Sequence, residues 1–88
     1  MSIKIELSPI LYQYTNDRQV AEVNGSAVGQ CLSRLVKRFT KLKLFDKDGQ
    51  LLNYIEIYVN SESAYPQELD KPVKDGDELS IILMIAGG

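Results

Sequence analysis

The chain has 88 residues, with 10 Lys and Arg, 12 Asp and Glu, no His and one Cys, and its formal net charge is −2. A chain of this length forms one domain and has no room for an enclosed catalytic cleft of its own. Without His and with a single Cys, it cannot hold a His-assisted nucleophile, a zinc site or an internal disulfide, and we expect no metal. The slight acidity argues against nucleic acid as a partner.

The hydropathy pattern argues against membrane association and secretion. The longest apolar run, Ile81 to Ala86, is far shorter than the roughly 20 residues of a membrane span. The first residues alternate between apolar and polar types and lack the apolar stretch of a signal peptide. The sequence therefore predicts a cytoplasmic protein without a membrane partner, in a reducing compartment.

The N-terminal segment has the pattern of a β-hairpin. Ile3, Ile5 and Leu7 alternate with polar residues, which is the period of a half-buried strand. Pro9 limits strand pairing, so we expect an edge or a bulge there. Polar residues 15–18 are typical of a turn, and residues 19–23 then form a short returning strand.

A helix follows, from about residue 27 to about residue 41. Its apolar residues recur at helical spacing and form one stripe: Val28, Leu32, Leu35, Val36 and Phe39. Ser26 is a suitable N-cap, and because Gly29 would then occupy position N3, no capping box is expected.

Two further features of this helix have a structural and a functional interpretation. Cys31 lies beside the apolar stripe, so we interpret it as a small buried hydrophobe rather than as a thiol that carries sulfur. The opposite face is basic and is interpreted as solvent-exposed, with docking to an acidic partner as the alternative; it contains Arg34, Lys37, Arg38 and Lys41.

The C-terminal half predicts two strands and a long irregular segment. Residues 46–50 form a polar turn, and residues 51–59 are rich in β-formers. Residues 60–77 are polar and broken by prolines, with at most one very short strand. Residues 78–85 form the last strand, and because both of its faces are apolar we expect it to be central and parallel.

The turn before the last strand is acidic. Asp75 and Asp77 flank Gly76, and we expect their carboxylates to accept hydrogen bonds from backbone groups of the turn. The spacing lacks the alternating oxygen ligands and the distal Glu of a calcium loop. All elements together suit one mixed sheet with the helix packed across one face, an α+β architecture.

This order of elements resembles the ubiquitin-like β-grasp fold, with four to five strands and one helix. The closing run DGDELSIILMIAGG, residues 75–88, resembles the end of the small sulfur-carrier proteins. These include the molybdopterin synthase small subunit and the sulfur carriers of thiamine and cysteine biosynthesis. The IYVN run, residues 57–60, is similar to the strand and turn before their long loop, and the extended middle segment is closest to the cysteine type. The resemblance implies a β-grasp domain, residues 1–84, and a flexible Ala-Gly-Gly tail, residues 85–88.

The resemblance implies that the carboxylate of Gly88 is the functional group. A ubiquitin-activating-like adenylyltransferase would adenylate it with ATP and magnesium, and a sulfur donor would convert it to a thiocarboxylate for a sulfur-accepting biosynthetic enzyme. An ionised carboxylate is a poor electrophile and needs such a leaving group before sulfur can displace oxygen. The protein would be a covalent substrate and not an enzyme, with no bound cofactor, and a monomer when free.

The tail and one sheet face are the candidate contact surfaces. Glycines lack a Cβ, so a narrow active site can close around the extended tail, which consists of Ile85, Ala86, Gly87 and Gly88. Four apolar or aromatic residues should lie on the sheet face away from the helix and predict a partner docking patch: Tyr54, Tyr58, Ile82 and Met84. The alternative is that the 60–77 segment or a dimer mate covers this face.

Other functions remain open from the residues alone. A ubiquitin-like modifier, joined through Gly88 to target lysines, needs the same terminus and the same activation. A plain interaction module of this fold would keep working without Gly88. A free-standing enzyme is disfavoured because no acid and base pair is placed in anything resembling a pocket.

Overall fold

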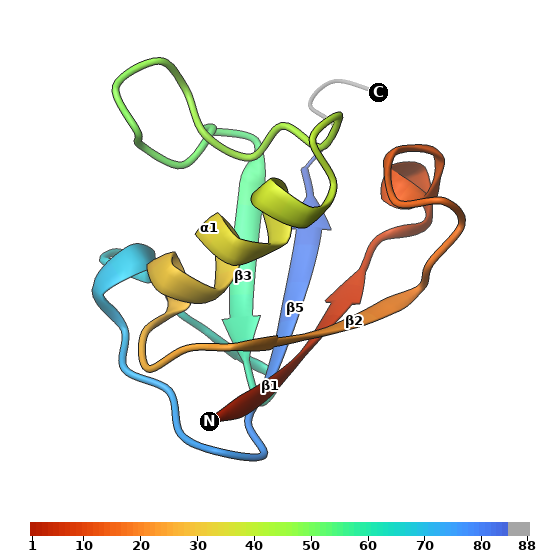
Figure 1. The fold of residues 1–88 in the computed structure, drawn as a ribbon. Coiled ribbons are helices and arrows are strands. Elements are labelled where there is room, and N and C mark those ends of the chain that lie inside the picture. Colours follow the sequence, from red (N-terminus) through yellow and green to blue (C-terminus); the bar gives the residue numbers. More distant parts are fainter. Residues whose placement is uncertain (85–88) are drawn as a thin grey trace.

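The computed structural model describes residues 1–84. It has a five-stranded mixed sheet in the order β2-β1-β5-β3-β4, with helix α1 across one face (Figure 1). The strands are β1 (Ser2–Leu7), β2 (Val20–Asn24), β3 (Ile55–Val59), β4 (Glu62–Ser63) and β5 (Glu78–Leu83), and the helices are α1 (Val28–Arg38) and the 3₁₀ helices η1 (Pro9–Tyr14) and η2 (Glu68–Asp70). The predicted α+β architecture is confirmed. The predicted tail, residues 85–88, lies outside the described residues.

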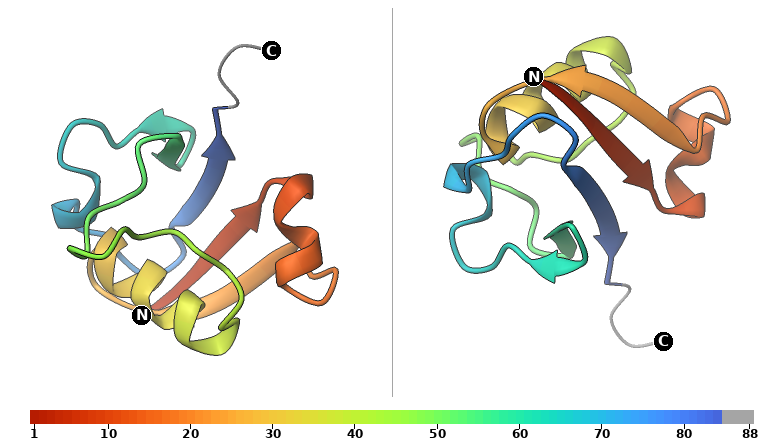
Figure 2. Two further views of the ribbon diagram at one scale, coloured as in Figure 1. Left: turned by 90° about the horizontal axis from the view of Figure 1, so that it is seen from above. Right: turned by 90° about the horizontal axis from the view of Figure 1, so that it is seen from below.

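The last strand is the middle strand of the sheet. β5 pairs in parallel with β1, with Leu79 opposite Ile5, and antiparallel with β3, with Ile81 opposite Ile57. β1 and β5 therefore run side by side in the same direction (Figure 2). The two apolar faces of this segment thus predicted its central, parallel placement correctly.

The core lies between the sheet and α1. Alternate residues of β1, β3 and β5 face the helix, and the largest fully buried side chains include Ile3, Ile5, Ile57, Leu79 and Ile81 from the sheet and Leu32 and Leu35 from α1. Cys31 is also fully buried, and desolvation raises the pKa of its thiol. Its interpretation as a small buried hydrophobe is confirmed.

The start of α1 differs from the prediction. The N-cap is Ala27, and the Ser26 hydroxyl and N–H both point to Oε1 of Gln30, at 3.2 and 2.8 Å. The N–H of Val28 instead donates to the carbonyl of Lys71, at 2.9 Å. The predicted Ser26 cap is wrong because a distant segment, and not a neighbouring hydroxyl, satisfies the first free donor of the helix.

The end of α1 also differs, since the helix stops at Arg38 and not near Lys41. Phe39 leaves the helical conformation, with φ −116° and ψ 87°, and its side chain is buried in the core. Leu42 N–H then bonds the Phe39 carbonyl at 2.9 Å and continues the chain as a tight turn. Burial of this aromatic side chain therefore accompanies the early end of the helix.

Two more boundaries lie elsewhere than predicted. β3 begins at Ile55 and not at Leu51, because Leu51 forms a single antiparallel bridge with Phe45 across the polar turn. The expected edge or bulge at Pro9 is the first residue of η1, a position where proline loses no helical hydrogen bond. The returning strand β2 covers 20–24 in place of 19–23.

Candidate functional site

The candidate site lies where β5 ends. Met84 follows the strand, and its N–H donates to the carbonyl of Tyr54 at 2.7 Å, which fixes the last described residue beside β3. The proposed reactive group on Gly88 and the tail residues before it lie outside the described residues. The part of the candidate site that the structure describes therefore consists of the surfaces around Met84.

The four residues of the predicted docking patch share one sheet face. The β3–β5 register places Ile82 opposite Glu56 and Tyr58 opposite Ser80, and the Met84 hydrogen bond brings Tyr54 beside Met84. Their side chains alternate with the buried core residues and so point away from α1. Tyr54, Ile82 and Met84 are 45%, 40% and 51% exposed, and Tyr58 is half-buried. The 60–77 segment leaves this face open, and its use in docking stays a prediction.

η1 extends the apolar surface at this end of the molecule. Exposed Ile10 and Tyr14 line a hollow of about 320 Å³ together with Tyr54, and Lys41 and Lys43 lie at the same hollow. In Figure 1, β5 ends on the side where η1 and the chain after α1 lie. Ile10 and Tyr14 were not predicted as site residues, because their segment has the pattern of a bulge and a turn. A proline directly before an apolar run is the signal for a short helix.

The two sequence runs that carry the family resemblance meet at the other end of β5. Asn60 donates from Nδ2 to Oδ1 of Asp77 at 3.0 Å and accepts at Oδ1 from the N–H of Glu78, also at 3.0 Å. Oδ2 of Asp77 accepts from the N–H of Lys74 at 2.9 Å. The Lys74 bond, followed by the Asn60 bond, lowers the pKa of Asp77. These bonds hold the start of β5 against the end of β3 and so support the register of the two strands.

The expected turn role is confirmed for Asp77 and modified for Asp75. Asp75 accepts a hydrogen bond from the backbone of Ser2 at 2.6 Å, so it ties the turn to the start of β1. Within residues 1–84, no group of three or more His, Cys, Asp or Glu residues could hold a metal ion.

Two arginines of the basic helix face form hydrogen bonds with the backbone of β2. Nη1 of Arg34 donates to the carbonyl of Asn24 at 2.7 Å, and Nη2 of Arg38 donates to that of Glu22 at 2.9 Å. Both carbonyls belong to β2, an edge strand of the sheet. Arg34 and Arg38 are exposed, as the interpretation of a solvent-exposed face predicted, and their guanidinium groups also satisfy an open strand edge.

The sheet order, the parallel central pair and the single crossing helix define a small ubiquitin-like β-grasp protein. The chain belongs to the ThiS family, whose model matches residues 7–88. It is 29% identical to a provisionally assigned sulfur carrier protein of Archaeoglobus fulgidus over the full length of both chains. No helix found among residues 1–84 is long and apolar enough to cross a bilayer.

Two solved structures are similar in fold and sequence. CysO in the BexX/CysO complex of Amycolatopsis orientalis has 29% identity and a TM-score of 0.85, with coverage of 98% of this chain and 99% of that chain. The small archaeal modifier protein 1 of Haloferax volcanii has 29% identity and a TM-score of 0.84, with full coverage of both chains. The protein therefore belongs among small sulfur carriers and ubiquitin-like modifiers.

Proposed function

We propose that this protein carries sulfur as a thiocarboxylate on Gly88, in cofactor or cysteine biosynthesis. The observation that carries the proposal is the extent of the family match, which runs to residue 88 and so includes the Ala86-Gly87-Gly88 ending. The buried and inert environment of Cys31 supports it further, because the only thiol is a poor alternative sulfur carrier.

The chemistry proceeds in two steps, both catalysed by partners. An adenylyltransferase joins the Gly88 carboxylate to the α-phosphate of ATP, with magnesium, and releases pyrophosphate. A sulfur donor then attacks the acyl carbon, the bond to AMP breaks, and AMP leaves. The remaining thiocarboxylate holds a nucleophilic sulfur that a biosynthetic enzyme can accept, while the carrier itself needs no bound cofactor.

Intact mass spectrometry tests this proposal. The full chain is incubated with ATP, magnesium, sulfide and an adenylyltransferase shown to be active on another carrier. We expect a gain of about 16 Da, because sulfur replaces oxygen at the activated carboxylate. The matched control lacks only Gly88 and should show no gain. An unchanged mass of the full chain with an active partner would contradict the proposal.

The patch of Tyr54, Tyr58, Ile82 and Met84 is proposed as the surface that docks on the adenylyltransferase. Exposed apolar and aromatic side chains of this kind are typical of partner contacts. We expect Met84→Asp to reduce adenylation at least tenfold, since a desolvated charge at an interface costs well over 1.4 kcal/mol. Its thermal unfolding should change little, because Met84 is half exposed.

The control for this substitution is Val20→Asp. Val20 is as exposed as Tyr54 but lies on β2, away from the patch. Adenylation of this variant should stay within about twofold of the original, as for a surface change outside an interface. Normal adenylation of Met84→Asp, measured by pyrophosphate release, would remove the patch from the docking surface.

A second candidate function is protein modification through Gly88. The observation that favours it is the similarity to the small archaeal modifier protein 1. Activation would be the same, but a lysine amine would displace AMP and form an isopeptide. Species of higher mass with Gly88 linked to lysines would support the modifier function, and a free thiocarboxylate as the sole product would support the carrier.

A further inference from the structure

The hollow of about 320 Å³ between η1 and the end of β5 is lined by three separate parts of the chain. We call it the lysine hollow. Its lining includes residues from η1, from the segment after α1, and from the adjoining ends of β3 and β5: Ile10, Tyr14, Lys41, Lys43, Tyr54 and Leu83. Ile10 and Tyr14 are 46% and 41% exposed, and both lysines are exposed as well. A partner in solvent can therefore reach its apolar and its charged groups.

The lysine hollow carries positive charge. Its ionisable lining consists of Lys41, Lys43 and two tyrosines, without a carboxylate among the described residues. Lys43 also lines a neighbouring hollow of about 420 Å³, together with Lys37 and the half-buried Phe45. Residues 34–45 contain five Lys and Arg and no Asp or Glu, although the chain as a whole is acidic. This region therefore attracts anionic groups despite the net charge of −2.

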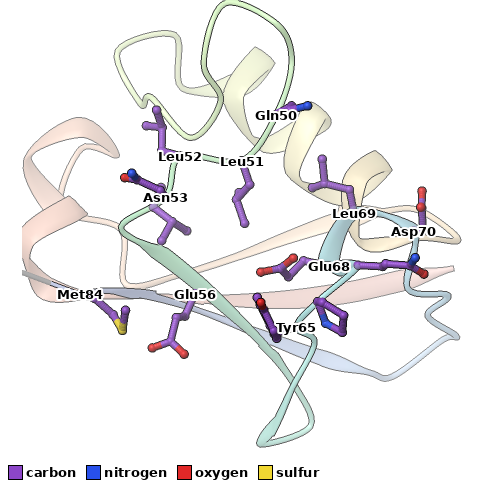
Figure 3. Close-up of a pocket in the computed structure, with 13 residues that line it drawn as sticks. Gln50, Leu51, Leu52, Asn53, Glu56, Tyr65, Glu68, Leu69, Asp70 and Met84 are labelled. Carbon is purple, nitrogen blue, oxygen red and sulfur yellow. The ribbon is translucent and has the colours of Figure 1, made fainter.

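The end of β5 also borders a surface of the opposite charge. A hollow of about 520 Å³ adjoins Met84, and its charged lining consists of Glu56, Glu68 and Asp70, without Lys or Arg among residues 1–84 (Figure 3). We call it the acidic hollow. Leu83 lines the lysine hollow and Met84 lines the acidic hollow. Two consecutive residues at the end of β5 thus adjoin a basic surface and an acidic one.

The position of the lysine hollow limits what can lie over it. Tyr54 belongs both to this hollow and to the docking patch, and its carbonyl accepts from the N–H of Met84 at 2.7 Å. Residues 85–88 continue the chain from Met84 and can span at most about 14 Å. A protein that receives Gly88, as the proposed function requires, must therefore approach the end of β5 closely and cover the surfaces around it.

We propose that the lysine hollow binds an acidic segment of the protein that receives the tail. An apolar or aromatic side chain of this segment would lie between the exposed residues of η1 and Tyr54, and carboxylates beside it would pair with Lys41 and Lys43. The acidic hollow would repel the same segment, so the two charges together would set the orientation of the partner. The choice of partner rests on the proposed function, but the binding itself does not need the chemistry of the tail.

The probe is a blocked peptide with one Phe and two Asp residues on each side of it, added to the ¹⁵N-labelled full chain. The largest NMR shifts should fall in residues 10–14, 41–43 and 54, which line the lysine hollow. A peptide with Lys in place of each Asp should bind at least about tenfold more weakly, because it meets two like charges. Absence of these shifts, shifts centred elsewhere, or equal binding of both peptides would overturn the proposal.

A third peptide tests the apolar contact. It has Ala in place of Phe and should bind at least about threefold more weakly, because less apolar surface is buried. Equal binding of this peptide would reduce the site to a general attraction of opposite charges and would overturn the proposal. Tighter binding of a short RNA at the same residues would assign the hollow to nucleic acid, with the same consequence.

Two double variants test the lysines. Lys41→Gln with Lys43→Gln should weaken binding of the Asp peptide about threefold to tenfold, because two exposed ion pairs are lost. The matched control is Lys4→Gln with Lys71→Gln, which removes the same charge beside the starts of β5 and α1. Its binding should stay within about twofold of the original. Equal weakening in both variants would attribute binding to net charge and overturn the proposal. Thermal melts of both variants check the fold.

The peptide titration and the mass measurement can fail independently. A chain that lacks Gly88 should bind the Asp peptide as the full chain does, because the lysine hollow lies among residues 1–84. A mass gain without peptide binding would overturn the acidic-segment site and leave sulfur transfer standing. Peptide binding without a mass gain would overturn sulfur transfer and leave the acidic-segment site standing.

Discussion

Asp77 links stability to pH. Hydrogen bonds from Lys74 and Asn60 lower its pKa below the ordinary value of 3.8, so the folded state binds this proton less readily than the unfolded chain. The stability that the Asp77 carboxylate contributes is therefore present above pH 3.8 and is lost as the pH falls through the lowered pKa.

We expect Asp77→Asn to unfold at a lower temperature than the original protein at pH 7. The difference should shrink below about pH 4, where the original carboxylate also becomes protonated. Circular dichroism melts over a pH series measure both quantities. A difference that stays constant down to pH 2 would show that the charge of Asp77 plays no part.

Gly25 is required by a close approach to α1. A Cβ at this position would lie 2.6 Å from Sγ of Cys31 and 3.3 Å from its backbone nitrogen. We expect Gly25→Ala to lower the free energy of unfolding by about 1–3 kcal/mol, the usual cost of overpacking a core. Urea unfolding provides the measurement.

A double-mutant cycle checks the cause. Cys31→Ala removes the sulfur, so the cost of Gly25→Ala should fall when both changes are combined. If the losses of unfolding free energy from the two single variants simply add in the double variant, the strain lies at the backbone contact and not at the thiol.

At the level of secondary structure, different groups cover the strands near the two edges of the sheet. Arg34 and Arg38 bond outward carbonyls of β2, whereas β4 and Ala64 lie beside most of β3. An Arg34→Ala, Arg38→Ala double variant would open the β2 edge, and two copies could then pair through their β2 edges.

We expect this double variant to self-associate at concentrations where the original protein stays monomeric, as measured by light scattering. Loss of two exposed hydrogen bonds should cost only about 1–3 kcal/mol of stability in total. The control is Lys37→Ala, Lys41→Ala, which removes the same charge but leaves β2 covered. Equal association of both variants would attribute the effect to net charge.

The periodicity of the sequence predicted which elements exist but not where all of them end. Alternation in β1, the apolar stripe of α1 and the two-sided β5 report burial, which is a local property of each side chain. The ends of α1 depend on the Lys71 carbonyl and on burial of Phe39, both contributed by tertiary structure. Such partners are distant in sequence, so the pattern around Ser26 could not reveal them.

In the candidate site, too, features set by the local pattern were predicted and features set by tertiary contacts were not. The shared face of Tyr54, Ile82 and Met84 follows from strand parity and was predicted. The contribution of Ile10 and Tyr14 was not predicted, because it depends on which segments become neighbours. The reactive role proposed for residues 85–88 rests on resemblance, since glycines have no periodicity to interpret.

For the molecule as a whole, β5 is indispensable. Among residues 1–84, it is the only strand that joins β1 and β2 to β3 and β4. A chain that stops at residue 77 would lose Leu79 and Ile81 from the core and leave two separate strand pairs. We expect this fragment to show no cooperative thermal transition by calorimetry, whereas the chain without residues 85–88 should melt close to the original. A cooperative transition in the fragment would contradict this.

The parallel pairing of β1 with β5 also affects the order of events during synthesis. Ser8 bonds the carbonyl of Ile81 across 73 residues, so the sheet cannot close until nearly the whole chain has been made. Because the N-terminus is made first, β1 waits through most of translation for its central neighbour. A copy that has folded has therefore been translated through the strand that leads directly into Ile85–Gly88. A copy cut short before β5 therefore lacks the sheet on which the proposed docking patch lies, so folding would keep such copies from partners that dock there.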